Sequence, residues 1–365
     1  MKKRILAAEI GLLVLLTLVG YIGRVEAKDK IHALYLPLAD HYAAAVVAKA
    51  KYGDKMEKCD YSVEMMKSVP SLRGKFMAGQ ADVAYFVAPI ALDMFSEKPF
   101  FRCVSLVHRD GNALAVNDIF AKRLNLPAER KDRKPTPDLA NEMAKWKKET
   151  GKASSCAIPS PIGTHVIVLY KYLKENGKTL SIEQGDGDVI AKVVAPPQSA
   201  EFLQLEAKGG RAASFEQSLP WADIVETEGQ GKVVWYSKDV MKWPLGHVEC
   251  IMIATDDAIK NKREALKELI YYIHKAGRDI EEARTKGGPA LEEIATLVNK
   301  AIPAHTVKAV SQSLQKDIDA INYSNLNVDI AGTKMIMDLA LEGGILKKAV
   351  DITAFHDESF KTELH

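Results

Sequence analysis

The chain has 365 residues, of which 47% are hydrophobic and 27% are charged. This composition supports large buried cores and excludes a chain that is disordered throughout. The 50 basic and 48 acidic residues leave a net charge of +2, which gives no sign of a nucleic-acid partner.

The first 27 residues have the features of a secretory signal peptide. Three basic residues at positions 2–4 precede a short apolar run over 10–23, and Ala27 offers a small residue at a cleavage position. A transmembrane anchor would need about 20 predominantly apolar residues. The first cysteine is Cys59, so a lipid-modified N-terminal cysteine is not available. We therefore expect cleavage near Ala27 and an unanchored, periplasmic protein of about 340 residues, a length that suggests two domains.

The first half of the mature chain alternates short strands with helices. Apolar runs that stop at proline, glycine or aspartate predict strands over 31–36, 62–66, 82–87, 103–108 and 113–117. Helices are expected over 42–51 and 71–78. The charged, proline-containing stretch over 118–153 predicts a surface segment at a crossing between domains, with one helix over 139–149.

The second half repeats this alternation and ends in helices. Strands are expected over 155–158, 189–195, 212–215, 232–236 and 248–254, and helices over 164–174 and 199–207. Apolar residues three and four apart over 266–280 mark one face of a long helix, and a further helix is expected near 335–341. Strands alternating with helices predict an α/β fold with mainly parallel sheets and a ligand site between two domains.

Four predicted loops lie where a strand ends and a helix begins, at 37–41, 67–71, 160–165 and 215–221. Such loops can present backbone N–H groups and a helix N-terminus to an anion. The polar and aromatic candidates on or just behind these loops are Asp40, His41, Ser68, Arg73, Ser160, Thr164, His165, Gln217 and Trp221. Each also has an ordinary interpretation as a helix cap, a surface charge or a core residue.

The sequence gives little support for a catalytic or metal-binding site. The sequence contains no GxSxG, HExxH, Walker or GxGxxG motif. Ser160, His165 and Asp223 are the residue types of a catalytic triad, but no sequence feature supports a triad geometry. His247 and Glu249 lie two apart on a predicted strand and share a face, but a lone pair is weak support for a metal, so we predict no metal or other cofactor.

The four cysteines are far apart and form no CxxC motif and no Cys/His cluster at metal spacing. They are Cys59, Cys103, Cys156 and Cys250. An exported protein can pair some of its cysteines, and buried thiols are equally compatible with the sequence.

Several segments resemble those of the substrate-binding proteins of bacterial ABC importers in the nitrate/sulfonate/bicarbonate and thiamine-precursor group. Residues 36–40 are similar to the group's IPLTD segment, 73–84 to its RxxLxxGxxDxA segment with an Ala-Pro at 88–89, and 163–165 to its GTH helix start. Residues 219–221 are similar to EPW, 243–250 to WxxHPEK, and 111–114 fall where relatives cross between lobes. These segments occur in the same order as in the group, and the resemblance extends over residues 31–360.

The resemblance implies a two-lobed periplasmic-binding-protein fold of type II with a hinge. Lobe I would comprise 28–116 and 249–365, and lobe II 117–248. A monomer would trap a small anionic or polar solute between the lobes and deliver it to an ABC membrane permease, without catalysis. The same resemblance adds Pro89, Asn112 and Glu249 to the candidate solute-binding residues.

Two departures from the nitrate receptors point to a different solute. Val69 stands where they carry a tryptophan, and Cys250 stands where they carry a lysine. An alternative is an exported enzyme of the same fold, with His165 or His41 as a base acting on a small heterocycle or oxyanion. A third possibility is a receptor that reports to a membrane sensor rather than a permease.

Overall fold

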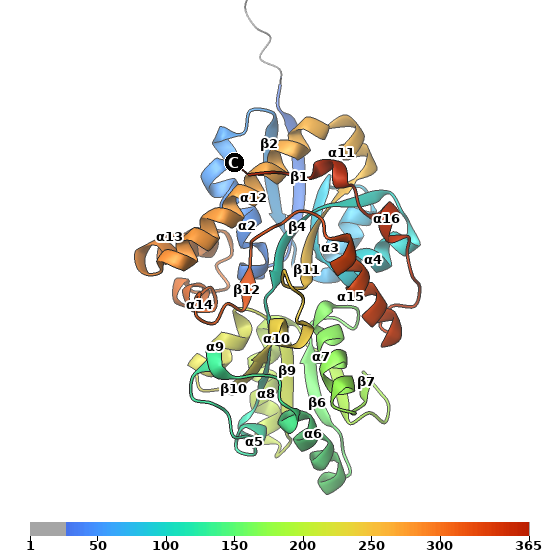
Figure 1. Ribbon diagram of the computed structural model, residues 1–365, viewed down its shortest axis with the longest axis vertical. Helices are drawn as coiled ribbons and strands as arrows, with labels where there is room; N and C mark the ends of the chain where they lie inside the picture. The colour runs from blue at the N-terminus through green and yellow to red at the C-terminus, as the bar shows by residue number, and fades with distance from the viewer. Residues whose placement is uncertain (1–26, 365) are drawn as a thin grey trace, which may run out of the picture.

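The computed structural model describes residues 27–364, and the side chains of residues 39 and 40 are outside this description. The predicted signal peptide therefore lies outside the described residues apart from Ala27. The described chain folds into two α/β lobes, each built on one six-stranded sheet and stacked along the long axis of the molecule (Figure 1). This confirms the predicted two-lobed α/β architecture. None of the described helices is long and apolar enough to cross a membrane.

The first lobe contains the start and the end of the described chain. Its sheet has the order β12 (Ile321–Asn322), β4 (Phe101–Asp110), β11 (Val248–Thr255), β3 (Val83–Val87), β1 (Asp29–Tyr35) and β2 (Cys59–Met65). β1 runs parallel to β2 and β3, whereas β11 is antiparallel to both β3 and β4. The sheet is thus mixed rather than mainly parallel, because β11 enters from the other lobe.

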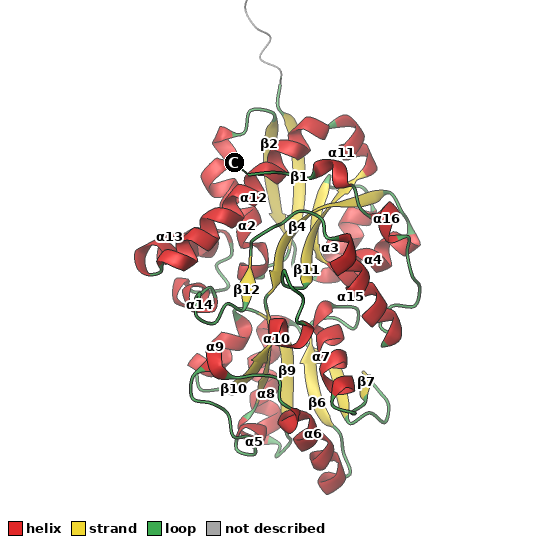
Figure 2. Ribbon diagram, in the orientation of Figure 1, coloured by secondary structure: helices red, strands yellow, loops and turns green. Residues whose placement is uncertain are grey.

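Helices cover both faces of this sheet (Figure 2). They are α2 (Ala39–Tyr52), α3 (Val69–Met77), α4 (Ala88–Glu97), α11 (Asp256–Asn261), α12 (Arg263–Lys286), α13 (Gly288–Ala301), α14 (Val307–Ser313), α15 (Ile330–Glu342) and α16 (Ile352–Phe355). The apolar stripe of α12 is buried as predicted, and α12 packs on α2 and α13. Gly277 lies in this stripe, where a Cβ would come within 2.9 Å of the Tyr323 carbonyl oxygen.

The second lobe is formed by the middle of the chain. Its sheet has the order β10 (Lys232–Tyr236), β5 (Asn112–Val116), β9 (Ala213–Ser218), β6 (Ser154–Ile158), β8 (Val189–Val193) and β7 (Leu180–Ile182). Its helices are α5 (Asp118–Ala121), α6 (Pro137–Thr150), α7 (Thr164–Glu175), α8 (Ser199–Lys208), α9 (Trp221–Thr227) and α10 (Ser237–Met241). β6 is parallel to β8 and β9, and β5 is antiparallel to β9 and β10.

The chain crosses between the lobes at two adjacent points. The outward crossing is at Gly111, whose φ of 99° suits glycine, and a Cβ there would lie 2.9 Å from the side chain of Ile321. β5 therefore belongs to the second sheet, so the predicted boundary after residue 116 was wrong. The return crossing runs over 242–247, just before β11. Asp110 N donates to the His247 carbonyl at 3.0 Å, and His247 N donates to Asp110 Oδ1 at 2.9 Å, which ties the crossings together.

Arg109 reinforces this junction from the first lobe. Its side chain is almost fully buried, donates to the Gly246 carbonyl at 3.0 Å and pairs with Asp329 at 2.8 Å. Asp329 in turn caps α15 through the Gly332 N–H. Gly246 has φ 83°, and a Cβ there would lie 2.4 Å from Asp110 Oδ2. The junction thus depends on a glycine in each crossing and on one buried ion pair.

Candidate functional site

The crossings bring polar side chains of both lobes into one buried group, which we call the inter-lobe cluster. None of its members is more than 2% exposed. The first lobe supplies His41 from α2, His108 from β4, and Glu249 and Cys250 from β11. The second lobe and the return crossing supply Asn112, Thr164, His165, Glu216, Ser218, Ser237 and His247. Parallel strand ends and the start of α7 place these groups together, as expected for ligand sites in α/β folds.

His41 is the centre of the contact between the lobes. Its Nε2 lies 3.1 Å from the Gly111 carbonyl oxygen. Its ring stacks on that of His165, with centroids 6.2 Å apart and planes 12° from parallel. His165 is held in turn by Ser218, whose Oγ lies 2.8 Å from Nε2. The two histidines predicted at separate strand-to-helix junctions therefore face each other across the lobes.

His247 holds the return crossing against the second lobe. Its Nε2 lies 3.0 Å from Ser237 Oγ, and the same hydroxyl accepts a bond from the Asn112 N–H at 3.2 Å. Its Nδ1 lies 3.6 Å from Glu249 Oε2. His247 thereby links α10, β5 and β11 through one imidazole, so it positions Asn112 and Glu249 rather than pairing with Glu249 alone.

Many polar atoms of the cluster are buried without a hydrogen-bond partner among the described residues. They are both side-chain amide atoms of Asn112, Thr164 Oγ1, His165 Nδ1, His108 Nε2 and both carboxyl oxygens of Glu216 and of Glu249. Leaving a buried polar group unpaired costs about 1–3 kcal/mol each. Native proteins rarely accept this cost repeatedly in one place. A polar solute held between the lobes would supply the missing partners.

Burial makes the cluster nearly uncharged at neutral pH. It raises the pKa of Glu249 to about 8 and that of Glu216 well above its ordinary value. The negative charge of Asp110 adds to the rise for Glu249, and that of Glu249 adds to the rise for Glu216. The side chains of Asn112 and Thr164 lower the Glu249 pKa in opposition, although neither meets hydrogen-bond geometry with its carboxyl group. Both carboxyls therefore hold protons and can donate hydrogen bonds.

The imidazoles of the cluster are neutral for the same reason. Burial lowers the pKa of His41 to about 4 and lowers the pKa values of His165 and His108 well below their ordinary value. Each neutral ring offers one donor and one acceptor. The cluster is thus a set of neutral donors and acceptors at the N-terminus of α7, without a lysine or arginine among its members.

The structure brings together five of the predicted site residues, which are His41, Asn112, Thr164, His165 and Glu249. Gln217 lies on β9 rather than in a loop, because the strand continues to Ser218. Its side chain alternates to the face opposite Glu216 and donates to the Val194 carbonyl at 3.2 Å. Asp40 begins α2 in sequence, but its side chain is outside the described part of the structure, so its role stays a prediction.

The other predicted residues have local partners. Ser68 is exposed and forms a capping box with Ser71 at the start of α3. Arg73 pairs with Asp93 at 2.8 Å and Glu97 at 2.7 Å, so its charge is already neutralised by α4. Neither residue is placed in the inter-lobe cluster.

Pro89, Ser160 and Trp221 also make contacts of their own. Pro89 is buried in the first turn of α4, and Ser160 Oγ accepts a bond from Ile162 N. Trp221 packs edge-on against His305, with ring centroids 4.5 Å apart, and its indole N–H has no partner. A contact of Trp221 with solute stays a prediction.

Ser160, His165 and Asp223 do not form a catalytic triad in the structure. His165 pairs with Ser218 and not with Ser160. Asp223 instead contacts Arg130 and Tyr236, which hold its buried carboxylate, although burial raises its pKa to about 6. Ser160, His165 and Asp223 therefore give no triad geometry to support the enzyme alternative.

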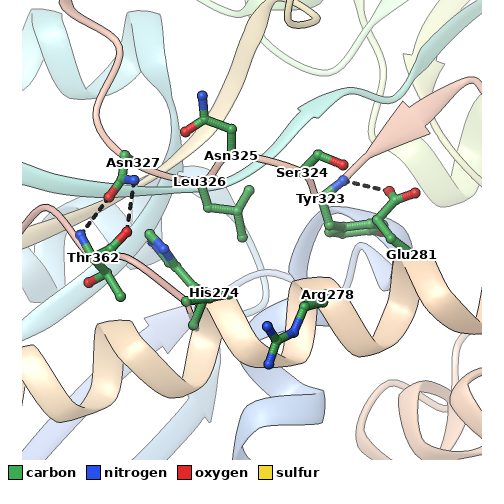
Figure 3. Close-up of a pocket in the computed structure, with 10 residues that line it drawn as sticks. His274, Arg278, Glu281, Tyr323, Ser324, Asn325, Leu326, Asn327 and Thr362 are labelled. Carbon is green, nitrogen blue, oxygen red and sulfur yellow. Dashed lines mark hydrogen bonds between the residues drawn. The ribbon is translucent and has the colours of Figure 1, made fainter.

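A second hollow lies within the first lobe and is distinct from the cluster (Figure 3). It has a volume of about 320 Å³ and lies between α12 and the segment 323–327. Some of its polar groups are paired with each other: Asn327 and Thr362 exchange two bonds, and Tyr323 N donates to Glu281 at 2.8 Å. Because all the residues that line this pocket belong to the first lobe, lobe closure would not gate it.

Sequence reasoning missed His108, Glu216, Ser218 and Ser237. Glu216 and Ser218 fell within the predicted loop 215–221 without being singled out, and His108 and Ser237 are polar residues at the end of, or just after, mainly apolar strands. Whether such a residue faces the other lobe depends on strand order, which spacing does not reveal. Cys250 was noted only as a departure from the resembling family.

A model of the NMT1-like family matches residues 26–295. No curated protein matches the chain significantly in sequence. Among solved structures, the periplasmic nitrate-binding protein of Synechocystis PCC 6803 has 15% identity and a TM-score of 0.71, over 91% of this chain and 87% of that one. The zinc-bound ligand-binding component of an ABC-type import system from Staphylococcus aureus has 16% identity and a TM-score of 0.69, over 91% and 98%. The aliphatic sulphonate binding protein of Escherichia coli has 13% identity and a TM-score of 0.65, over 93% and 94%. At these identities the likeness shows the fold.

Proposed function

Since the chain belongs to the NMT1-like family and has the fold of ABC-importer binding components, we propose that it is an extracytoplasmic receptor for a small polar solute. The solute binds between the lobes, and the loaded monomer delivers it to the membrane permease of an ABC importer. The predicted signal peptide supports export to the periplasm. No chemical change of the solute is part of this proposal.

The observation that carries the proposal is the set of unpaired polar atoms at the inter-lobe cluster. Both lobes contribute to it, with Glu249 from β11 and Thr164 and Asn112 from the second lobe. A site used only for folding would pair these groups with one another. A solute that accepts bonds from the Glu249 carboxyl and the Thr164 hydroxyl would bind only when the lobes are together, which couples binding to closure.

The chemistry of the cluster indicates the solute class. Protonated carboxyls, neutral imidazoles and the start of α7 favour a small solute rich in oxygen acceptors. The absence of a cation among the cluster residues, together with Val69 and Cys250 at the two positions noted above, argues against a nitrate-type site. Carbonyl-bearing heterocycles fit the donor set better, because their oxygens are neutral and accept bonds without requiring a lysine partner, whereas a sulfonate carries the same unit charge as nitrate.

Closure would pivot on the two crossings. Gly111 and the segment 242–247 are the only backbone links between the lobe sheets among the described residues, and Asp110, just before Gly111, is hydrogen-bonded to His247. Hinges of this kind absorb backbone rotation at a few residues while each lobe moves as a body. The same motion would bring His165 against His41.

Thermal-shift screening of the mature chain with oxyanions, sulfonates and pyrimidines tests the proposal. A solute that binds only the folded protein raises the melting temperature, and above Kd the rise grows with the logarithm of the solute concentration. The expected result is a concentration-dependent rise for one class, lost when the cluster hydroxyl is removed by Thr164→Val and retained in Glu228→Gln at an exposed position. No rise with any class would contradict a receptor for these solutes.

A further inference from the structure

We propose that His41, His108 and Cys250 form a binding site for a divalent transition-metal ion, with zinc as the best match, on the first-lobe side of the inter-lobe cluster. One donor atom from each residue lies within 4.8 Å of the other two, and all three side chains are fully buried. Two imidazoles and one thiolate are a donor set that suits zinc and related ions.

The measured geometry fits a tetrahedral centre. His41 Nδ1 lies 3.4 Å from Cys250 Sγ. In a tetrahedral zinc site with Zn–N near 2.0 Å and Zn–S near 2.3 Å, the nitrogen and sulfur donors stand about 3.5 Å apart. The ring of His108 lies beside that of His41, with centroids 4.3 Å apart, and its donor atom lies within 4.8 Å of the other two. The donors are therefore already close to the spacing that an ion requires.

The surrounding contacts orient the two imidazoles for metal binding. His41 Nε2 lies 3.1 Å from the Gly111 carbonyl oxygen, which places the proton on Nε2 and leaves the Nδ1 lone pair facing Cys250. Metal-binding histidines commonly donate their second N–H to a backbone carbonyl in this way. Within the described part of the chain, His108 Nε2 is buried without a hydrogen-bond partner. Burial also keeps both rings in the neutral, metal-binding form.

A thiol–imidazole hydrogen bond between Cys250 and His41 explains fewer of these contacts than a bound metal ion does. It would account for the contact between Cys250 and His41, but it leaves the His108 nitrogen unpaired in the protein interior. A metal ion satisfies all three groups at once. It also stabilises the thiolate, which burial alone would disfavour.

All three ligands come from the first lobe, from α2, β4 and β11. The ion can therefore bind before the lobes close, and it is a resident of this lobe rather than the transported solute. Three protein ligands leave a fourth tetrahedral position for water or a solute atom. His165 of the second lobe, stacked 6.2 Å from His41, closes over the ion. The proposal extends beyond solute binding and does not depend on the solute's identity.

Titration of the chelator-treated mature chain with Co²⁺ alone tests the site. Cobalt replaces zinc in such centres and reports thiolate ligation by a charge-transfer absorption band. We expect one Co²⁺ per chain with this band, displaced by Zn²⁺. Cys250→Ser should abolish the band, and His108→Ala should weaken binding more than about 10-fold, since even indirect partners contribute that much. Cys156→Ser, which removes a buried thiol of the second lobe, is the matched control and should keep the band.

Wild-type protein without a thiolate band, or a band that survives in Cys250→Ser, would overturn the proposal. The wild-type titration decides it even if a variant fails to fold. Thr164→Val separates the two proposals, because it should lose solute affinity and keep the cobalt band. Solute binding without the band would remove the metal site alone, and the band without any solute response would leave the metal site standing.

Discussion

The buried carboxyl of Glu249 predicts a specific dependence of stability on pH. Burial raises its pKa from 4.5 to about 8, so the folded protein holds a proton that the unfolded chain releases over that range. The unfolded state then binds fewer protons, and the free energy of unfolding falls as pH rises from about 4.5 to about 8. Replacing the group by its neutral isostere in Glu249→Gln removes this dependence.

The magnitude follows from the pKa values. At about 1.4 kcal/mol per pH unit, the gap between 4.5 and about 8 corresponds to about 5 kcal/mol of unfolding free energy. We expect wild type and Glu249→Gln to have similar stability at pH 5. At pH 9 the wild type should be less stable by several kcal/mol. Glu216 is present in both proteins, and Glu249 helps to raise its pKa, so the difference between the curves reports Glu249 together with its coupling to Glu216.

Urea unfolding followed by circular dichroism at pH 5, 7 and 9, on protein freed of solute, measures the effect. Glu228→Gln makes the same change at an exposed position and should follow the wild type at each pH. Parallel curves for wild type and Glu249→Gln, within about 0.5 kcal/mol at every pH, would refute the reasoning, since 0.5 kcal/mol is the usual size of a surface substitution.

Three further outcomes are expected. Thr164→Val should lower solute affinity about 10-fold without lowering the melting temperature, because the hydroxyl has no hydrogen-bond partner among the described residues; calorimetric titration showing unchanged affinity would count against the cluster. Arg109→Ala should destabilise by about 3–5 kcal/mol, because it leaves the Asp329 carboxylate without its buried partner; a loss under 1 kcal/mol in urea would show that the junction does not depend on this pair. All four cysteines are unpaired and buried, so Ellman's reagent should titrate four thiols after unfolding and none within minutes before it; a disulfide in the native protein would contradict the structure.

Local signals located most elements of the fold. α7 begins at Thr164 and β10 covers Lys232–Tyr236, as predicted, because glycine, proline and apolar runs mark these bounds in the sequence. α4 was missed because Pro89 was interpreted as the end of a strand. Proline is equally suited to the first turn of a helix, where its missing N–H is not needed.

Long-range pairing was not accessible in the same way. The apolar strand 112–116 pairs with β9 and β10, and nothing in its five residues says which sheet it joins. The resemblance to a known group predicted Asn112 and Glu249, whereas Glu216 and His108 became apparent only when strand order placed them between the lobes. His41, His108 and Cys250 meet although they are far apart in sequence, so no spacing rule could detect them.

Native mass spectrometry of the protein purified from its native host without dialysis tests the central claim most directly. A solute trapped between the lobes should appear as a non-covalent adduct of small organic mass, present in the native spectrum and lost on denaturation. The same preparation of a folded double variant, Thr164→Val with Glu249→Ala, should lack this adduct. An adduct of equal occupancy in wild type and double variant would place the solute elsewhere and contradict the account.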